Sequence, residues 1–139
     1  MALEVDGEEA EVLSKRLAGT NVEIVSGDAA ALEYADESFD SVACFTMLHH
    51  VPTVSLQNRL LAEALRVLRP GGVLLGADSL ASDGLHHFHV DDTYNPVEVG
   101  SFLPRLQTIG FEKITIVVDG MLCFIAHKPG GQRSETSCE

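Results

Sequence analysis

The stretch that decides the fold reads "GDAAALEYADESFD" (27–40), "SVACFTMLHHV" (41–51) and, after a helical pattern, "RVLRPGGVLLGAD" (66–78). The apolar and β-branched run at 40–45 predicts a strand. Between 55 and 68, apolar residues recur at the spacing of one helical face. The Pro70-Gly71-Gly72 sequence ends this helix before a second strand at 73–77. This order of strand, helix and strand predicts two parallel strands of one sheet.

On the N-terminal side of this stretch, the sequence predicts one more helix and one more strand. Residues 8–17 place four small or apolar residues on one helical stripe: Ala10, Leu13, Leu17 and Ala18. Gly19 closes this helix, because glycine is favoured just beyond a helix C-terminus. Residues 22–25 predict a strand, and the short apolar-rich segment 2–5 opens the chain.

On the C-terminal side, residues 78–95 form a long loop, which is a candidate lid or binding loop. Pro96 is expected to open the next helix, whose inner side is formed by Val99, Phe102, Leu103 and Leu106. Pro104 predicts a kink or an early end of that helix. Gly110 ends it, and strands at 112–118 and 121–127 flank the turn Asp119-Gly120 as an antiparallel hairpin.

These elements predict an α/β fold with a doubly wound, Rossmann-like, mostly parallel sheet that ends in an antiparallel β-hairpin. Dinucleotide-binding dehydrogenases, the nearest rival class, normally end with a further parallel unit. Residues 1–128 are expected to form one domain, and residues 129–139 a disordered polar tail.

Composition and charge narrow the class of partner. The net charge is −12, and the nine lysines and arginines are scattered along the 139 residues. A protein that grips nucleic acid usually clusters its basic residues, so we expect no nucleic-acid partner. No window approaches the length of about 20 apolar residues that spans a bilayer, and the N-terminus lacks a signal-peptide pattern. We therefore expect no membrane partner, a cytoplasmic location and a small-molecule substrate.

In their order and spacing, the segments quoted above resemble the second part of a class I S-adenosylmethionine (SAM) dependent methyltransferase of the small-molecule type. The stretch 27–40 is similar to the family's G-D-A-x-x-L-P-F-x-D-x-S-F-D, departing at Glu33 from the usual proline and at Tyr34 from phenylalanine. "LHHV" and "RVLRPGGVLL" match well. The resemblance covers about residues 3–128 and implies methyl transfer by direct displacement.

The resemblance also implies the cofactor, SAM, and the residues that hold it. Glu4 would accept the ribose hydroxyls, with Asp6 as the alternative carboxylate, and Val5 would lie against the adenine. Asp28 would accept the adenine amine, and the backbone amide of Ala29 would serve a ring nitrogen. The backbone at Cys44 and Phe45 would pass the methionine part. Two alternatives stay open at this point: Glu4 is a solvated carboxylate near the terminus, or Asp28 caps the following helix.

His49 and His50 follow the strand at 40–45, at the edge where open α/β sheets present their ligands. An imidazole titrates near neutral pH, so His50 is a candidate to orient or deprotonate the methyl acceptor. The alternative is that this dipeptide packs beneath the following loop. No catalytic residue is assigned.

Other reactive side chains predict no metal site. A histidine and aspartate cluster lies at 86–92, but we expect a solvated lid there, because His87 and His89 suit one metal only in an extended loop. Cys44 and Cys123 lie in apolar stretches and are expected to be buried thiols, whereas Cys138 is expected to be exposed.

In the resembling family, a strand that ends in a glycine-rich D-x-G-x-G loop precedes the part matched here, and this sequence opens beyond it. That strand lies at the centre of the spatial order 3-2-1-4-5-7-6, and its burial contributes roughly 6–15 kcal/mol. We expect the gap to be closed either by direct pairing of strand two with strand four, or by a homo-oligomer or partner chain.

The glycine-rich loop also holds the methionine carboxylate and ammonium. Without about three charge-assisted hydrogen bonds of ~1.5–3 kcal/mol each, SAM binding is expected to be weak or absent. Three functions remain. The first is a methyltransferase that is weak or inactive as this chain alone, and the second is a non-catalytic methyltransferase-like subunit that completes its sheet with another chain. The third is another kind of nucleotide-binding domain, which the terminal hairpin disfavours.

Overall fold

The computed structural model describes residues 2–4, 11–12, 15–16, 18–20, 24–26, 29–45, 48–79 and 97–130. The chain divides into two compact units, Met1–Glu33 and Tyr34–Glu139. Several expectations fall outside the described residues: the roles of Val5 and Asp28, most of the loop at 78–95, the thiol of Cys138 and nearly all of the tail at 129–139.

The first unit contains a parallel pair of short strands, β1 (Ala2–Glu4) and β2 (Ile24–Ser26). Glu4 lies opposite Ser26, so the carboxyl ends of both strands meet at one edge. Residues 11–12 and 15–16 are helical, as the pattern at 8–17 predicts. Gly19 has a φ of +88°, the left-handed conformation that favours glycine after a helix.

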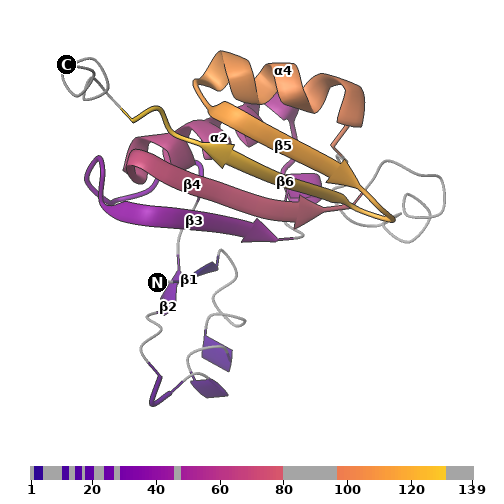
Figure 1. The fold of residues 1–139 in the computed structure, drawn as a ribbon. Helices are drawn as coiled ribbons and strands as arrows, with labels where there is room; N and C mark the ends of the chain where they lie inside the picture. The colour runs from indigo at the N-terminus through magenta and orange to yellow at the C-terminus, as the bar shows by residue number, and fades with distance from the viewer. Residues whose placement is uncertain are drawn as a thin grey trace, which may run out of the picture. The chain divides into compact units, whose positions relative to one another are not determined.

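The second unit is built on a mixed four-stranded sheet: β3 (Phe39–Phe45), β4 (Leu68–Asp78), β5 (Glu112–Val118) and β6 (Leu122–His127). Their spatial order is β3-β4-β6-β5 (Figure 1). β3 and β4 are parallel, whereas β6 runs antiparallel to both β4 and β5. The predicted α/β class and the C-terminal hairpin are therefore confirmed.

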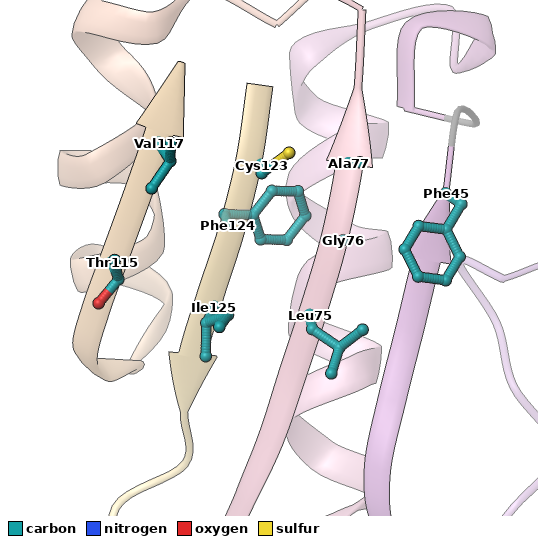
Figure 2. Close-up of a pocket in the computed structure, with 9 residues that line it drawn as sticks. All are labelled: Phe45, Leu75, Gly76, Ala77, Thr115, Val117, Cys123, Phe124 and Ile125. Atoms are coloured by element: carbon teal, nitrogen blue, oxygen red, sulfur yellow. The ribbon is translucent and has the colours of Figure 1, made fainter. Parts of the chain in front are cut away.

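Two helices, α2 (Val54–Val67) and α4 (Val99–Ile109), cover the same face of this sheet (Figures 1 and 2). Thr53 caps α2, because its side-chain oxygen accepts a hydrogen bond from the Leu56 amide at 3.1 Å. α4 begins at Val99 with Glu98 as N-cap, so the expectation that Pro96 opens it is wrong. Pro104 does not end α4, which runs on to Gly110 at a φ of +129°.

Side chains alternate between the two faces of the sheet, since successive residues of a strand point to opposite sides. On β6, Leu122, Phe124 and Ala126 are buried against the helices, whereas Cys123 and Ile125 are exposed. The expectation of a buried Cys123 is therefore wrong. On α4, Phe102 and Leu106 are buried as predicted, but Val99 and Leu103 are exposed. The remaining fully buried apolar residues of the core include Leu48, Leu61, Leu68, Leu74 and Val97.

β4 is longer than the predicted strand at 73–77. It begins at Leu68, directly after α2, and its pairing with β3 shifts in register between Phe39 and Ser41. The end of the hairpin holds this first part of β4, because the Lys128 amide donates to the Gly72 carbonyl at 2.9 Å and the Gly71 amide to the Lys128 carbonyl at 3.0 Å. Gly71 has a φ of +80°, which favours glycine here.

The described strands form two separate sheets, β1-β2 and β3-β4-β6-β5. The expected direct pairing of family strand two with strand four would join β1 of the first unit to β3 of the second, and it stays a prediction. Among the described residues, no helix has the length and apolar character needed to cross a membrane.

Candidate functional site

The candidate site of the second unit lies where the parallel strands β3 and β4 end. Phe45 and Ala77 form the last pair of their register, so both carboxyl ends meet at one edge. A 3-10 turn, η1 (Leu48–His50), follows β3, and Asp78 is the last residue of β4. Ligands of open α/β sheets bind at such edges.

The Asp78 carboxylate connects the two strand ends. One oxygen, Oδ2, accepts the Leu48 amide at 2.7 Å. The other, Oδ1, lies 2.7 Å from His49 Nδ1 and accepts the Ser79 amide at 2.8 Å. The Asp78 side chain has no exposed surface, and His49 is also buried. A buried carboxylate is costly unless polar groups surround it, and here two backbone amides and the His49 ring do so.

His50 differs from His49 in its exposure. The two imidazole rings stack with centroids 4.0 Å apart at an interplanar angle of 39°, but only His49 is buried. The predicted pair is therefore split into one ring inside the protein and one ring at the surface. Burial of His49 agrees with the packing alternative for that residue, whereas His50 is exposed at the surface.

A second series of hydrogen-bonded polar side chains holds the opposite side of the turn η1. Gln57 of α2 is fully buried, and its Nε2 donates to the Leu48 carbonyl at 2.8 Å. Arg105 of α4 donates from Nη2 to Gln57 Oε1 and from Nε to Asn58 Oδ1, both at 2.9 Å. Partial burial lowers the pKa of the Arg105 guanidinium, which also lies 5.6 Å from the Phe102 ring centroid.

Cys44 is the last buried side chain of β3 and carries no reactive thiolate. Burial raises the pKa of its thiol to about 12, and the nearby negative charge of Asp78 adds to this effect. The thiol is therefore protonated at neutral pH. Cys44 is a packing residue here, in agreement with its predicted burial.

The structure divides the predicted SAM-binding residues between the two units. Glu4 ends β1, and Ala29 lies in a half-buried turn after β2. Cys44 and Phe45 end β3, and His49 and His50 follow them within the second unit.

Three residues of the site were not predicted from the sequence: Asp78, Gln57 and Arg105. A carboxylate directly after an apolar strand was a usable signal for Asp78, as it was for Asp28. Gln57 stands next to the predicted apolar stripe of its helix, and nothing in the sequence marks Arg105.

The sheet face opposite the helices carries an open apolar hollow of about 290 Å³ (Figure 2). Phe45, Leu75 and Ala77 line it from the parallel strands, and Val117 and Ile125 from the hairpin. Phe45, the last residue of the edge strand β3, is 58% exposed. This face, called the open sheet face below, has no helix of Tyr34–Glu139 over it among the described elements.

Within the described part of the chain, no three histidine, cysteine or acidic residues come together as metal ligands. The cluster at 86–92 lies outside the described residues.

Comparison with known proteins identifies the family. The sequence matches the family model of a methyltransferase domain over residues 1–76, more than half of the chain. It is 41% identical over 76 residues to phthiotriol/phenolphthiotriol dimycocerosates methyltransferase 1 of Mycobacterium ulcerans, which covers 55% of this chain and 27% of that protein. The chain thus spans about a quarter of the length of the curated relatives it matches.

Solved structures share the fold at low sequence identity. A SAM-dependent methyltransferase from Thermotoga maritima has a TM-score of 0.71 and 19% identity, covering 91% of this chain and 72% of that one. PigF with S-adenosylhomocysteine (SAH) has a TM-score of 0.71 and 16% identity, covering 91% of this chain and 42% of that one. The chain therefore belongs to the methyltransferase domain family, with the fold of the class I SAM-dependent enzymes.

Proposed function

We propose that this chain forms part of a SAM-dependent methyltransferase that acts on a small-molecule acceptor. The observation that carries the proposal is the turn η1, which the buried Asp78 and Gln57 side chains hold at the carboxyl ends of β3 and β4 while His50 stays exposed. A rigid turn with one exposed imidazole suits the acceptor side of a transfer site. The net charge of −12 favours a small molecule over nucleic acid.

The first unit would hold the adenosine part of SAM. Because β1 and β2 are parallel and Glu4 lies opposite Ser26, Glu4 and the turn at Ala29 follow strand ends at one edge. This arrangement fits a carboxylate for the ribose hydroxyls and a backbone amide for the adenine. Val5 and Asp28, between these positions in sequence, would complete the adenine contacts.

The second unit would hold the methionine part and the acceptor. The backbone of Cys44 and Phe45 ends β3 two residues before the turn η1. When bound, SAM would supply a methyl group on a positively charged sulfur, which would keep the electron pair of the broken bond. His50 would orient the acceptor O–H or N–H group and take its proton.

We further propose that the 139-residue chain by itself binds SAM weakly. Its sequence contains no D-x-G-x-G, the loop that holds the methionine carboxylate and ammonium in the resembling family. About three charge-assisted hydrogen bonds at ~1.5–3 kcal/mol each correspond to three or more orders of magnitude in affinity. Binding in the millimolar range follows for a site that is otherwise micromolar.

Saturation-transfer NMR with SAH tests both statements, because it detects millimolar ligands. We expect stronger saturation of the adenosine protons than of the homocysteine protons. Glu4→Gln and Asp28→Asn should each weaken the adenosine signal. Glu11→Gln removes an equal charge at an exposed position of the same unit and should leave it unchanged. If no saturation is transferred to SAH, the proposed cofactor site is wrong. If calorimetry gives a micromolar dissociation constant for SAM, the proposal of weak binding is wrong.

The second candidate function is a non-catalytic methyltransferase-like subunit that completes its sheet with another copy or a partner chain. The open sheet face favours it. Size-exclusion chromatography with light scattering measures the mass of the chain in solution. A homo-oligomer supports this function, whereas a monomer that transfers methyl groups contradicts it.

A further inference from the structure

We propose that Asp78 is a positioning residue: its buried carboxylate sets the tautomer of His49 and thereby fixes the ring of His50 that faces the methyl acceptor. The acceptor in this statement rests on the function proposed above. The positioning itself rests on the contacts of Asp78, His49 and His50 alone.

The first step concerns the proton on His49. The two Asp78 oxygens accept the amides of Leu48 and Ser79, so each oxygen already acts as an acceptor in this arrangement. Nδ1 of His49, 2.7 Å from Oδ1, is therefore the donor of the third hydrogen bond. With the proton on Nδ1, the lone pair of a neutral His49 lies on Nε2.

The second step concerns the turn that carries both rings. Leu48 is held at its amide by Asp78 and at its carbonyl by Gln57, and both of these side chains have no exposed surface. The Val51 amide also donates to the Leu48 carbonyl at 3.0 Å and closes the turn. The Asp78 carboxylate thus contacts both the backbone next to His49, at the Leu48 amide, and the His49 ring itself.

The third step passes from His49 to His50. The rings lie against each other at a tilt of 39°, with centroids 4.0 Å apart, so the exposed ring packs on the buried one. A change in the orientation of His49 therefore moves His50. A purely packing role for Asp78 would need none of this specificity, because an apolar residue fills buried space at lower electrostatic cost.

Asp78→Asn tests the proposal because its shape is nearly unchanged. We expect the Asn oxygen to stay on the buried Leu48 amide, because the Ser79 amide, which then loses its acceptor, is only partly buried and can bond to water instead. The NH2 group then faces His49 Nδ1. A donor at that position requires the imidazole proton to move to Nε2. An isosteric amide that imposes the wrong tautomer is a recognised consequence of this substitution in Asp–His pairs.

The measurement is the ¹⁵N and ¹H spectrum of the histidine rings at neutral pH. We expect the Nδ1–H tautomer of His49 in the unmodified chain, the Nε2–H tautomer in Asp78→Asn, and displaced His50 ring signals in that variant. Asp40→Asn is the matched control, since Asp40 is exposed and pairs with Arg69 at 2.8 Å. It should change neither ring.

Two measurements keep the proposal testable if Asp78→Asn does not fold. The unmodified chain must show the Nδ1–H tautomer and a nuclear Overhauser effect between the two rings. His49→Gln retains a donor toward Asp78 but removes the ring, and should move the His50 signals to those of a solvated imidazole. An Nε2–H tautomer in the unmodified chain, or an unchanged His50 in both variants, overturns the proposal. These spectra need neither SAM nor acceptor, so failure of the proposed function would appear separately, in the SAH experiment.

Discussion

The rings of Phe102 and Phe124 pack edge to face, with centroids 5.0 Å apart and an interplanar angle of 70°. Phe102 belongs to α4 and Phe124 to β6, and both are buried. This pair therefore joins the helix layer to the sheet. Aromatic pairs in this geometry contribute about 0.5–1.5 kcal/mol beyond their burial.

Gly76 makes room for this pair, so we predict that Gly76→Ala destabilises the second unit. A Cβ at Gly76 would lie 2.5 Å from Cζ of Phe124 and would also meet the Cys44 carbonyl oxygen. Overpacking of this kind costs about 1–3 kcal/mol. Urea unfolding followed by far-ultraviolet circular dichroism measures the loss.

Gly100→Ala is the matched control for Gly76→Ala. Gly100 is exposed in the first turn of α4, and the nearest atom to an added Cβ is Glu98 Oε1 at 3.9 Å. Alanine in a helix stabilises by about 0.4–1 kcal/mol relative to glycine. Equal free energies of unfolding for the two variants would contradict the packing described at Gly76.

The contact between Gln57 and Arg105 predicts energetic coupling of α2 and α4. Gln57→Ala and Arg105→Ala should each lower the free energy of unfolding by about 1–3 kcal/mol, because each removes one partner of the hydrogen bond between these side chains. The double variant should cost less than the sum, with a coupling energy of about 0.5–3 kcal/mol from the unfolding free energies.

The ion pair between Asp40 and Arg69 provides the comparison for that cycle. Its atoms lie 2.8 Å apart, as short as the buried contacts, but both side chains are exposed. Exposed pairs contribute about 0–1 kcal/mol, so the coupling energy of Asp40→Ala and Arg69→Ala should be smaller. A larger coupling for the exposed pair would mean that burial does not strengthen the Gln57–Arg105 contact.

The helices and strands of the second unit could be predicted from the sequence because the residue patterns that indicate them are local. The strand at 40–45 and the helix at 55–68 agree with β3 and α2 to within one residue, and the terminal hairpin with β5 and β6. Gly110 ends α4 as its position predicts. The prediction from Pro96 was wrong because proline is tolerated before a helix as well as in its first turn. Pro96 therefore indicates that a helix begins nearby but not at which residue α4 begins.

The candidate site was only partly predictable because its contacts are distant in sequence. Asp78 lies 29 residues from His49, and Arg105 lies 48 residues from Gln57. No periodicity connects such positions, and only the strand register brings them together. His49 and His50 were predictable as neighbours of a strand end, but their split into a buried and an exposed ring depends on where Asp78 lies.

Cys44 and Cys123 should differ strongly in their reaction with iodoacetamide. At neutral pH, a thiol with a pKa near 12 is about 10⁻⁵ ionised, and Cys44 is also shielded by burial. Cys123 is exposed on the open sheet face and should react much faster. Mass spectrometry of the labelled peptides measures both rates.

The pH dependence of that reaction has a definite sign. Because burial raises the pKa of Cys44, its thiolate fraction and its labelling rate in the folded protein should rise about tenfold per pH unit up to pH ~11. When the chain is unfolded in urea, Cys44 and Cys123 should be labelled at similar rates. Rapid labelling of Cys44 at neutral pH in the folded chain would contradict the burial described.

The open sheet face predicts self-association that a charge should weaken. Ile125 is 44% exposed and lines the same hollow as Phe45 and Val117, so a second apolar surface placed over it would remove all three side chains from water. Ile125→Glu introduces a charge that such burial would leave unpaired. Light scattering should therefore give a lower average mass for this variant than for the unmodified chain. Val54→Glu is the control, because Val54 is 49% exposed on α2, away from this face. Since both variants make the net charge more negative by the same amount, general repulsion affects them equally. Equal masses for Ile125→Glu and Val54→Glu would exclude the open sheet face as the interface.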